Sequence, residues 1–170
     1  KAGPCENINI QDNTVYHAHG GFVIGSEFSG GMKNIVVRNN TFQGTDAGLR
    51  FKSAVKRGGK SENIYIDHIY MTDITGDAIT FETTYFDNHV GAKQQAAPVK
   101  QEFLPDFQDI HISNVYVRGC KNGIVAHGAE GMIHDITIKD SNIFYNKNAK
   151  DIDAACKITL ENVNFSTFAK

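Results

Sequence analysis

A short pattern that recurs along the chain constrains the fold more than any other feature of the sequence. Each copy begins with Asn or Asp and continues with an apolar residue, any residue and a second apolar residue. The five regular copies and a less regular sixth are Asn7–Ile10, Asn34–Val37, Asn63–Ile66, Asp109–Ile112, Asp135–Ile138 and Lys157–Leu160. Eight positions after each start comes another apolar residue: Val15, Phe42, Met71, Val117, Ile143 and Phe165. An internal repeat of this kind indicates a repeat architecture.

The apolar residues alternate within each copy, which is the periodicity of a β-strand, and no segment carries a sustained helical stripe. The copies start 27, 29, 46, 26 and 22 residues apart. A second strand is indicated by apolar residues 15 or 16 positions after four of the starts, namely Val23, Leu49, Ile79 and Ile124. The pattern predicts an all-β fold, a right-handed, single-stranded parallel β-helix of about six coils stacked ~4.8 Å apart. A β-propeller would need about 40 or more residues per blade, and a Rossmann-like fold would need intervening helices.

The whole chain, residues 1–170, is expected to form one domain, because 41% hydrophobic and 21% charged residues are typical of a folded module. The first coil would offer an open backbone edge, and residues 1–4 are too few to cap it. We therefore expect further N-terminal coils, so that this chain is the C-terminal portion of a longer β-helix. The 46-residue interval predicts an inserted loop at residues 86–106, and loops of this size tend to be functional.

Composition argues against several classes of protein. The formal net charge is -2 and no long basic run is interleaved with aromatic residues, so nucleic acid is not an expected partner. The sequence contains no run of eighteen apolar residues, so no membrane span is predicted, and it does not begin with a signal-peptide pattern. Cys5, Cys120 and Cys156 lack the paired short spacings of zinc sites. We interpret them as buried thiols, with one disulfide among them as the alternative.

Two histidines, His17 and His19, open a glycine-rich stretch that ends at Glu27. In an extended segment both rings would face the same side. A metal site would need a third ligand, and none is evident nearby, so surface histidines in a turn are the favoured interpretation and no metal is expected.

A basic cluster without acidic residues consists of Arg50, Lys52, Lys56, Arg57 and Lys60. If Leu49 and Phe51 point into the core, Arg50 and Lys52 share the outer face of a strand and can converge on one anion. The equal alternative is an ion pair between coils, because the repeat register places Lys52 above Glu82.

The stretch His19-Gly20-Gly21-Phe22-Val23-Ile24-Gly25-Ser26-Glu27, followed by Gly48-Leu49-Arg50-Phe51-Lys52 and then by Tyr85, resembles the polygalacturonases, glycoside hydrolase family 28, and bacterial members most of all. In that family a Gly-His-Gly motif, a later Arg-Ile-Lys motif and a tyrosine surround the substrate. The similarity spans nearly the whole chain. Three departures leave every functional side chain in place: Ala18 replaces the first glycine, one residue is added after the histidine motif, and Phe51 replaces isoleucine.

The resemblance implies roles for four residues. His19 would lie beside the catalytic carboxylates and help set their protonation, and Arg50 and Lys52 would bind the galacturonate carboxylate. Tyr85 would support the sugar by a hydroxyl hydrogen bond or by packing against the ring. The resemblance also implies pectic polysaccharide or oligogalacturonate as the binding partner, an extracellular or periplasmic location, and neither a metal nor an organic cofactor.

The family's acid and base belong to an Asn-Thr-Asp and an Asp-Asp motif on preceding coils, and neither motif occurs in this sequence. Hydrolysis with inversion needs two carboxyl groups ~6.5–9.5 Å apart. We therefore expect the catalytic aspartates upstream of residue 1 and the 170-residue chain alone to be inactive. The carboxylates that could substitute are Glu27, Asp46, Asp77 and Glu82. For Asp46 and Asp77, in turns next to glycine, a solvated structural role is the default, and Glu82 has Lys52 as the expected partner.

Two functional interpretations follow. In the first, the parent protein is a glycoside hydrolase that cleaves α-1,4-galacturonosyl bonds with inversion, and this chain carries its substrate-binding residues. In the second, the chain is a non-catalytic β-helix that binds acidic polysaccharide or is merely structural. Endo and exo action, galacturonan and its rhamnose- or xylose-substituted relatives, and the oligomeric state all remain open at this point.

Overall fold

The computed structural model describes residues 3–84 and 103–167, which form ten β-strands. The strands are β1 (Cys5–Gln11), β2 (Thr14–Tyr16), β3 (Phe22–Ile24), β4 (Met32–Gln43), β5 (Leu49–Lys52), β6 (Lys60–Glu82), β7 (Asp106–Phe107), β8 (Ile110–His127), β9 (Ile136–Ile152) and β10 (Ile158–Thr167). All the pairings between these strands are parallel. Within the two described ranges, no helix has the length and apolar character that crossing a membrane requires.

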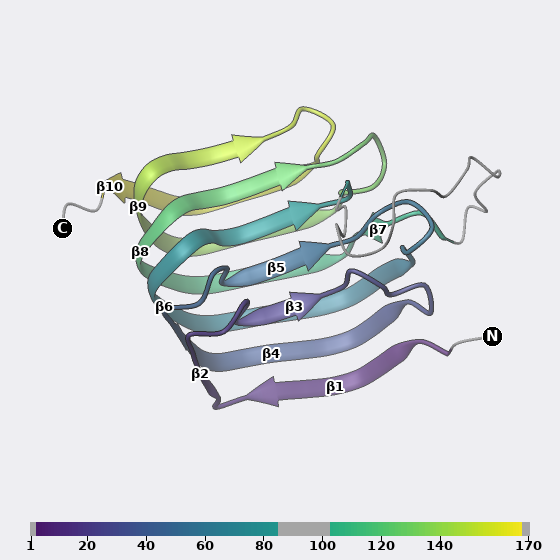
Figure 1. Ribbon diagram of the computed structural model, residues 1–170, viewed down its shortest axis with the longest axis horizontal. Coiled ribbons are helices and arrows are strands. Elements are labelled where there is room, and N and C mark those ends of the chain that lie inside the picture. Colours follow the sequence, from purple (N-terminus) through teal and green to yellow (C-terminus); the bar gives the residue numbers. More distant parts are fainter. Residues whose placement is uncertain (1–2, 85–102, 168–170) are drawn as a thin grey trace.

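The strands wind into a solenoid whose coils stack in the order β1, β4, β6, β8, β9, β10 (Figure 1). The second residue of each repeat pairs with its counterpart in the next coil, in the row Ile8, Ile35, Ile64, Ile110, Ile136 and Ile158. The apolar residues eight positions after each start form a second row, Val15, Phe42, Met71, Val117, Ile143 and Phe165. The predicted right-handed parallel β-helix, with one repeat per coil, is confirmed.

Three long strands, β6, β8 and β9, each cover more than one face of the solenoid. They bend round the left-hand side of Figure 1, so that their C-terminal ends lie beside the short strands β3 and β5. Leu49 of β5 pairs with Ile79 of β6, which in turn pairs with Ile124 of β8. This second face, which carries the candidate site, is therefore built from segments of five different strands.

The corners of the solenoid are occupied by residues with positive φ. At the start of the repeats these are Asn7, Asn34, Asn63, Asp109 and Asp135, with φ from 50° to 60°. Five positions later comes a second row, Asp12, Asn39, His68, Asn114, Asp140 and Asn162, with φ from 49° to 61°. Asn, Asp and His tolerate this left-handed region better than other L-residues. The corners thus explain why the repeat begins with Asn or Asp.

The centre of the solenoid is filled by inward-facing apolar side chains, and Leu49, Phe51 and Phe81 are all fully buried. The rings of Phe51 and Phe81 stack with their centroids 4.4 Å apart and their planes at 6°. Phe22 meets Phe51 edge-on at 6.2 Å. Close packing of this kind holds side chains in single conformations. The aromatic stack therefore gives β5 firm support from behind.

One predicted row differs from the structure by one position. Val23 was expected to align with Leu49, but Leu49 pairs with Phe22, whereas Val23 is 37% exposed and pairs with Arg50. The pairing of β6 with β8 shifts register between Ile74 and Asp77, at the bend of β6. The bend of β6 thus contains one residue more than that of β8. The 16-residue spacing from the start of the repeat to Ile79 therefore does not apply to the first coil, where Phe22 lies 15 residues after Asn7.

The cysteines and the predicted insertion also need comment. Cys120 and Cys156 are buried, as expected, but Cys5 is exposed because it opens β1, which among the described strands pairs only with β4. All three thiols are free, which excludes the disulfide alternative in this structure. Most of the insertion predicted at residues 86–106 lies outside the described residues. Its end is described, and there the carbonyl of Phe103 accepts a hydrogen bond from the amide of Lys56.

Candidate functional site

The outer side of β5 presents two cations of the basic cluster. Alternate residues of a strand point to opposite faces, and Leu49 and Phe51 are both 0% exposed. Arg50 and Lys52 consequently lie together on the solvent side, where both are partly exposed. The orientation expected from the sequence is therefore confirmed, and both side chains lie on one face of the solenoid.

His19 lies in the turn that leads into β3 and contacts the outer face of β5. Its Nε2 atom is 2.7 Å from Nη1 of Arg50, and its Nδ1 atom is 2.9 Å from Oδ2 of Asp46. The imidazole thus bridges a guanidinium and a carboxylate. The structure brings two predicted site residues, His19 and Arg50, into direct contact.

Asp46 is a member of this site that the sequence interpretation assigned to a solvated turn. It lies 27 residues after His19, which is the spacing of one coil, so the repeat register could have revealed the contact. The hydroxyl of Thr75, one coil further on, donates to Oδ1 of Asp46 at 3.2 Å. The hydrogen bond from His19 and then that from Thr75 lower the pKa of Asp46 below its usual value, since both favour the carboxylate.

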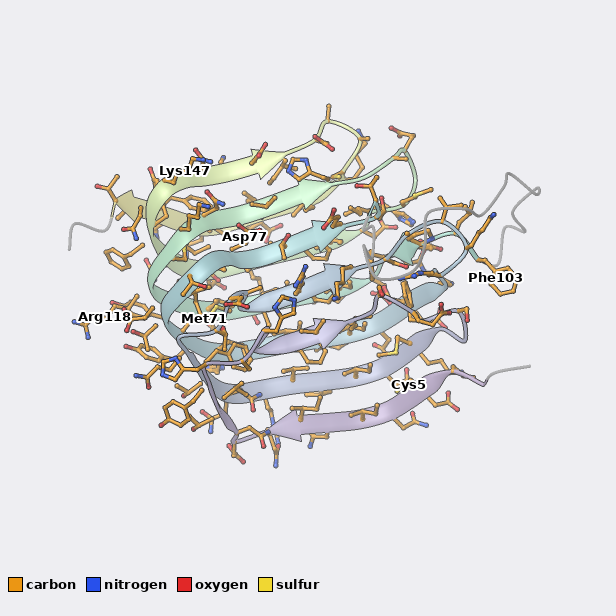
Figure 2. The ribbon with its side chains drawn as sticks, in the orientation of Figure 1. Cys5, Met71, Asp77, Phe103, Arg118 and Lys147 are labelled. Carbon is orange, nitrogen blue, oxygen red and sulfur yellow. The ribbon has the colours of Figure 1, made fainter. Side chains whose placement is uncertain are left out.

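A cavity of about 170 Å³ opens beside these residues. Its polar lining consists of Asp46, Arg50, Asp77, Thr80 and Glu82. Figure 2 labels Asp77, which lies on the same face as β5. Three of the four carboxylates considered as substitutes for the catalytic pair therefore share one cavity, whereas Glu27 is exposed and does not line it.

Two of those carboxylates have structural partners. Asp77 accepts a hydrogen bond from Asn122 Nδ2 at 2.8 Å, and Asn148 donates to Asn122 in turn at 3.1 Å, which links three coils. Glu82 pairs in register with Lys52, so the predicted placement of these two side chains in adjacent coils is confirmed. The guanidinium of Arg50 lines the cavity, and Lys52 lies on the same side of β5, so this face can hold an anion through charge-assisted hydrogen bonds.

Carboxylates and a histidine follow Lys52 on the next coils of this face. Glu82 pairs in register with His127 of β8. The ring of His127 lies 3.4 Å from a carboxylate oxygen of Asp151 and 3.3 Å from one of Asp153. On this face Arg50 and Lys52 are therefore followed, in the next coils, by carboxylates and a histidine.

The other histidine of the glycine-rich stretch lies elsewhere. His17 has a φ of 47°, which takes the chain out of the extended geometry, and its ring lines a different cavity with Asp73 and Lys121. The expectation that both rings face the same side is therefore wrong. Across residues 3–84 and 103–167, no group of three or more His, Cys, Asp or Glu side chains could hold a metal ion. The fourth predicted site residue, Tyr85, lies outside the described residues.

Comparison with known proteins agrees with the fold. The family model described as Glycosyl hydrolases family 28 matches residues 2–167. A polygalacturonase of Ralstonia solanacearum is 32% identical over 127 residues, which cover 72% of this chain and 22% of that protein. An exo-poly-alpha-D-galacturonosidase of Dickeya chrysanthemi is 30% identical over 118 residues, covering 69% of this chain and 19% of that protein.

A solved structure gives the same result. The hyperthermoactive exopolygalacturonase of Thermotoga maritima superposes with a TM-score of 0.81 and 32% identity, and the match covers 96% of this chain and 35% of that one. The chain thus spans between about a fifth and about a third of the length of these relatives. Since the family model covers almost all of its residues, this chain belongs to family 28 of the glycosyl hydrolases.

Proposed function

We propose that the chain is the substrate-binding part of a pectin-degrading hydrolase that cleaves α-1,4-galacturonosyl bonds with inversion. The observation that carries the proposal is the placement of Arg50 and Lys52 side by side on the outer face of β5, with His19 against Arg50. A galacturonosyl unit bears a carboxylate, and a planar guanidinium next to an ammonium suits that group. Membership of a family of glycosyl hydrolases supports the same substrate class.

In this proposal Arg50 and Lys52 act together on the substrate. Arg50 and Lys52 hold the carboxylate of one sugar unit, which fixes the position of the glycosidic bond relative to His19. Positioning of this kind turns binding energy into rate, because the reacting groups no longer have to find one another. The protein acts outside the cytoplasm, in the extracellular or periplasmic space, where pectic polymers are found.

The acid and the base are expected from another part of the protein. Inversion needs one carboxylic acid to protonate the leaving oxygen and one carboxylate to activate water, with room for the water between them. Asp46 already accepts hydrogen bonds from His19 and Thr75, and Asp77 accepts one from Asn122. These contacts support roles other than acid or base for both carboxylates. The small share of each relative that this chain spans supports a catalytic pair on coils outside it.

The test is the release of reducing ends from polygalacturonate by the 170-residue chain, beside a version extended upstream through the preceding coils. We expect only the extended version to be active. Arg50→Ala and Lys52→Ala in the extended version should raise the KM, whereas Arg38→Ala, which removes a guanidinium bound to Gln11 on another face, should not. Viscosity of the polymer solution, followed in the same reaction, separates endo from exo attack.

Two outcomes would contradict the proposal. An extended version that binds oligogalacturonate but releases no reducing ends would favour the non-catalytic polysaccharide-binding interpretation. Activity of the 170-residue chain itself would mean that carboxylates within it carry the chemistry, and Asp46, Asp77 and Glu82 would then be replaced in turn because they line one cavity.

A further inference from the structure

Asp46 is held in place from both neighbouring coils. Its amide donates to the carbonyl of Ala18 at 3.0 Å, next to His19. On the other side its carbonyl lies so close to Gly76 that a Cβ atom there would come within 2.5 Å of it. The carboxylate itself is fixed at Oδ1 by the Thr75 hydroxyl, at 3.2 Å. The group that faces His19 is therefore oriented before any ligand arrives.

The hydrogen bonds of His19 define where its proton lies. All five N–H groups of a guanidinium are donors and none is an acceptor. Nε2 of His19, which lies 2.7 Å from Nη1 of Arg50, must therefore be the unprotonated, accepting nitrogen. In a neutral imidazole the proton is then on Nδ1, and it points to Oδ2 of Asp46 at 2.9 Å.

We propose that Asp46 is a positioning residue: it holds His19 as the Nδ1–H tautomer, so that Nε2 accepts from Arg50 and aligns the guanidinium with the substrate carboxylate. The inference rests on the proposed function for its last step, because only a bound galacturonate gives the alignment a purpose. Asp46 itself need not touch the substrate. It acts through His19, in the way that a second carboxylate orients a catalytic or metal-binding histidine.

A contribution to stability is a poor explanation for the Asp46–His19 pair. The side chains of His19 and Asp46 are 68% and 62% exposed, and ion pairs at such sites add little to the free energy of unfolding. Replacing Asp46 should therefore leave the solenoid folded. The remaining explanation for the Asp46–His19 pair is that Asp46 orients the imidazole of His19 on the surface of a rigid coil.

The first experiment reads the tautomer directly. In the 15N-labelled chain, two-bond correlations of the imidazole distinguish a protonated from an unprotonated nitrogen, and His19→Gln identifies the signals of His19. We expect wild-type His19 to show a protonated Nδ1 and an unprotonated Nε2. In Asp46→Ala and Asp46→Asn it should shift to a mixture of tautomers, because neither side chain offers Nδ1–H a charged acceptor. Thr75→Val, which keeps the carboxylate and removes its hydroxyl donor, should give a smaller shift.

Asp73→Asn is the matched control. It makes the same chemical change at a corner residue with a φ of 54°, which asparagine accepts, and Asp73 lines the other cavity. The His19 nitrogen signals of Asp73→Asn should match those of the wild type. Thermal unfolding of each variant establishes that it is folded. Unchanged His19 nitrogen signals in both Asp46 variants would overturn the proposal.

The second experiment measures binding of trigalacturonate to the extended protein by calorimetry. Asp46→Ala should raise the Kd about fivefold, the effect of losing one orienting, charge-assisted hydrogen bond. If the wild type binds and Asp46→Ala shifts the tautomer without weakening binding, the step through Arg50 is wrong. If the wild type does not bind at all, the proposed substrate is wrong, while the tautomer experiment still decides what Asp46 does to His19.

Discussion

Lys52 of β5 lies directly beside Glu82 of β6 in the parallel pairing of the two strands. The carboxylate of Glu82 also lines the cavity next to Arg50. An anionic sugar bound by the two cations would therefore approach a negative charge, and part of the attraction would be offset. Glu82 is thus expected to weaken the binding of galacturonate and to limit which sugars the face accepts.

Glu82→Gln should tighten the binding of trigalacturonate by about two- to fivefold, because replacing one partly exposed charge is worth up to about 1 kcal/mol. Titration calorimetry at two salt concentrations is the measurement, and the gain should shrink at high salt as charges are screened. Glu62→Gln, which removes a carboxylate paired with Lys60, is the control. Weaker binding by Glu82→Gln would instead show that Glu82 accepts a hydrogen bond from the sugar.

The aromatic stack behind β5 leads to a prediction about stability. Phe81 is 0% exposed and its ring lies 4.4 Å from that of Phe51. Phe81→Ala should lower the free energy of unfolding by about 3–5 kcal/mol, because it removes a buried ring and leaves a cavity between coils. Urea unfolding followed by circular dichroism provides the value. Tyr65→Ala, at a ring that is 47% exposed, should cost far less, and equal losses would contradict the role assigned to the stack.

The repeat pattern predicted the coil register because it records a physical constraint. Inward positions must be apolar in every coil, and Ile35, Ile64 and Ile110 therefore recur at the same point of the repeat. The offset to the second strand was less well defined. It depends on how many residues each bend contains, and the alternation of apolar residues does not report that number, so Val23 was placed one position away from its true row.

The candidate site was predicted in part for a similar reason. Arg50 and Lys52 were assigned to one face because strand alternation fixes the direction of neighbouring side chains. Asp46 lies in a turn, where alternation gives no information, and only the one-coil spacing from His19 could have indicated its contact. Residues within turns are placed by the coils on either side of them. Their contacts therefore follow from register rather than from local sequence.

A histidine away from the site should make stability depend on pH. His134 lies 3.0 Å from Asp106 and 2.7 Å from Asp135. Burial opposes the charged ring, but the two carboxylates outweigh it and raise the pKa of His134 above its usual value. A raised pKa means that the protonated form is favoured in the folded state. The stabilisation is thus fully present below the unfolded pKa of about 6.5 and is lost as the pH rises through the higher folded value.

The check is thermal unfolding of the wild type and His134→Gln between pH 5 and pH 9. The difference in Tm between them should be largest at the acidic end and should fall as the pH rises. His68→Gln removes a histidine whose side chain is 68% exposed and which pairs with one carboxylate, Asp67, in the part of the chain that the structure describes, and it should change the profile less. A difference that grows towards alkaline pH would contradict the assigned sign.

The corner residues permit a sharper test, because backbone conformation and side-chain bonding can be separated there. Asn63 has a φ of 56°, and its side-chain Nδ2 donates to Oδ1 of Asn34 at 2.7 Å. Its backbone N–H donates to Oδ2 of Asp109 at 2.8 Å. Asn63→Gly removes the ladder hydrogen bond but keeps a residue suited to positive φ. Asn63→Ala loses the ladder hydrogen bond and also places a residue poorly suited to positive φ at the corner. It should be less stable than the glycine variant by about 1–2 kcal/mol in urea unfolding.

Asn142 is the matched position for this comparison. It also takes part in an asparagine pair, accepting from Asn164 at 3.3 Å, but it lies within β9 and has no positive φ. There the order should reverse, because glycine within a strand costs about 0.5–1 kcal/mol relative to alanine. Opposite rankings of Gly and Ala at the two sites would establish that the corner asparagines recur in the sequence for their backbone conformation. The same ranking at both would mean that the side-chain ladder is what the repeat preserves.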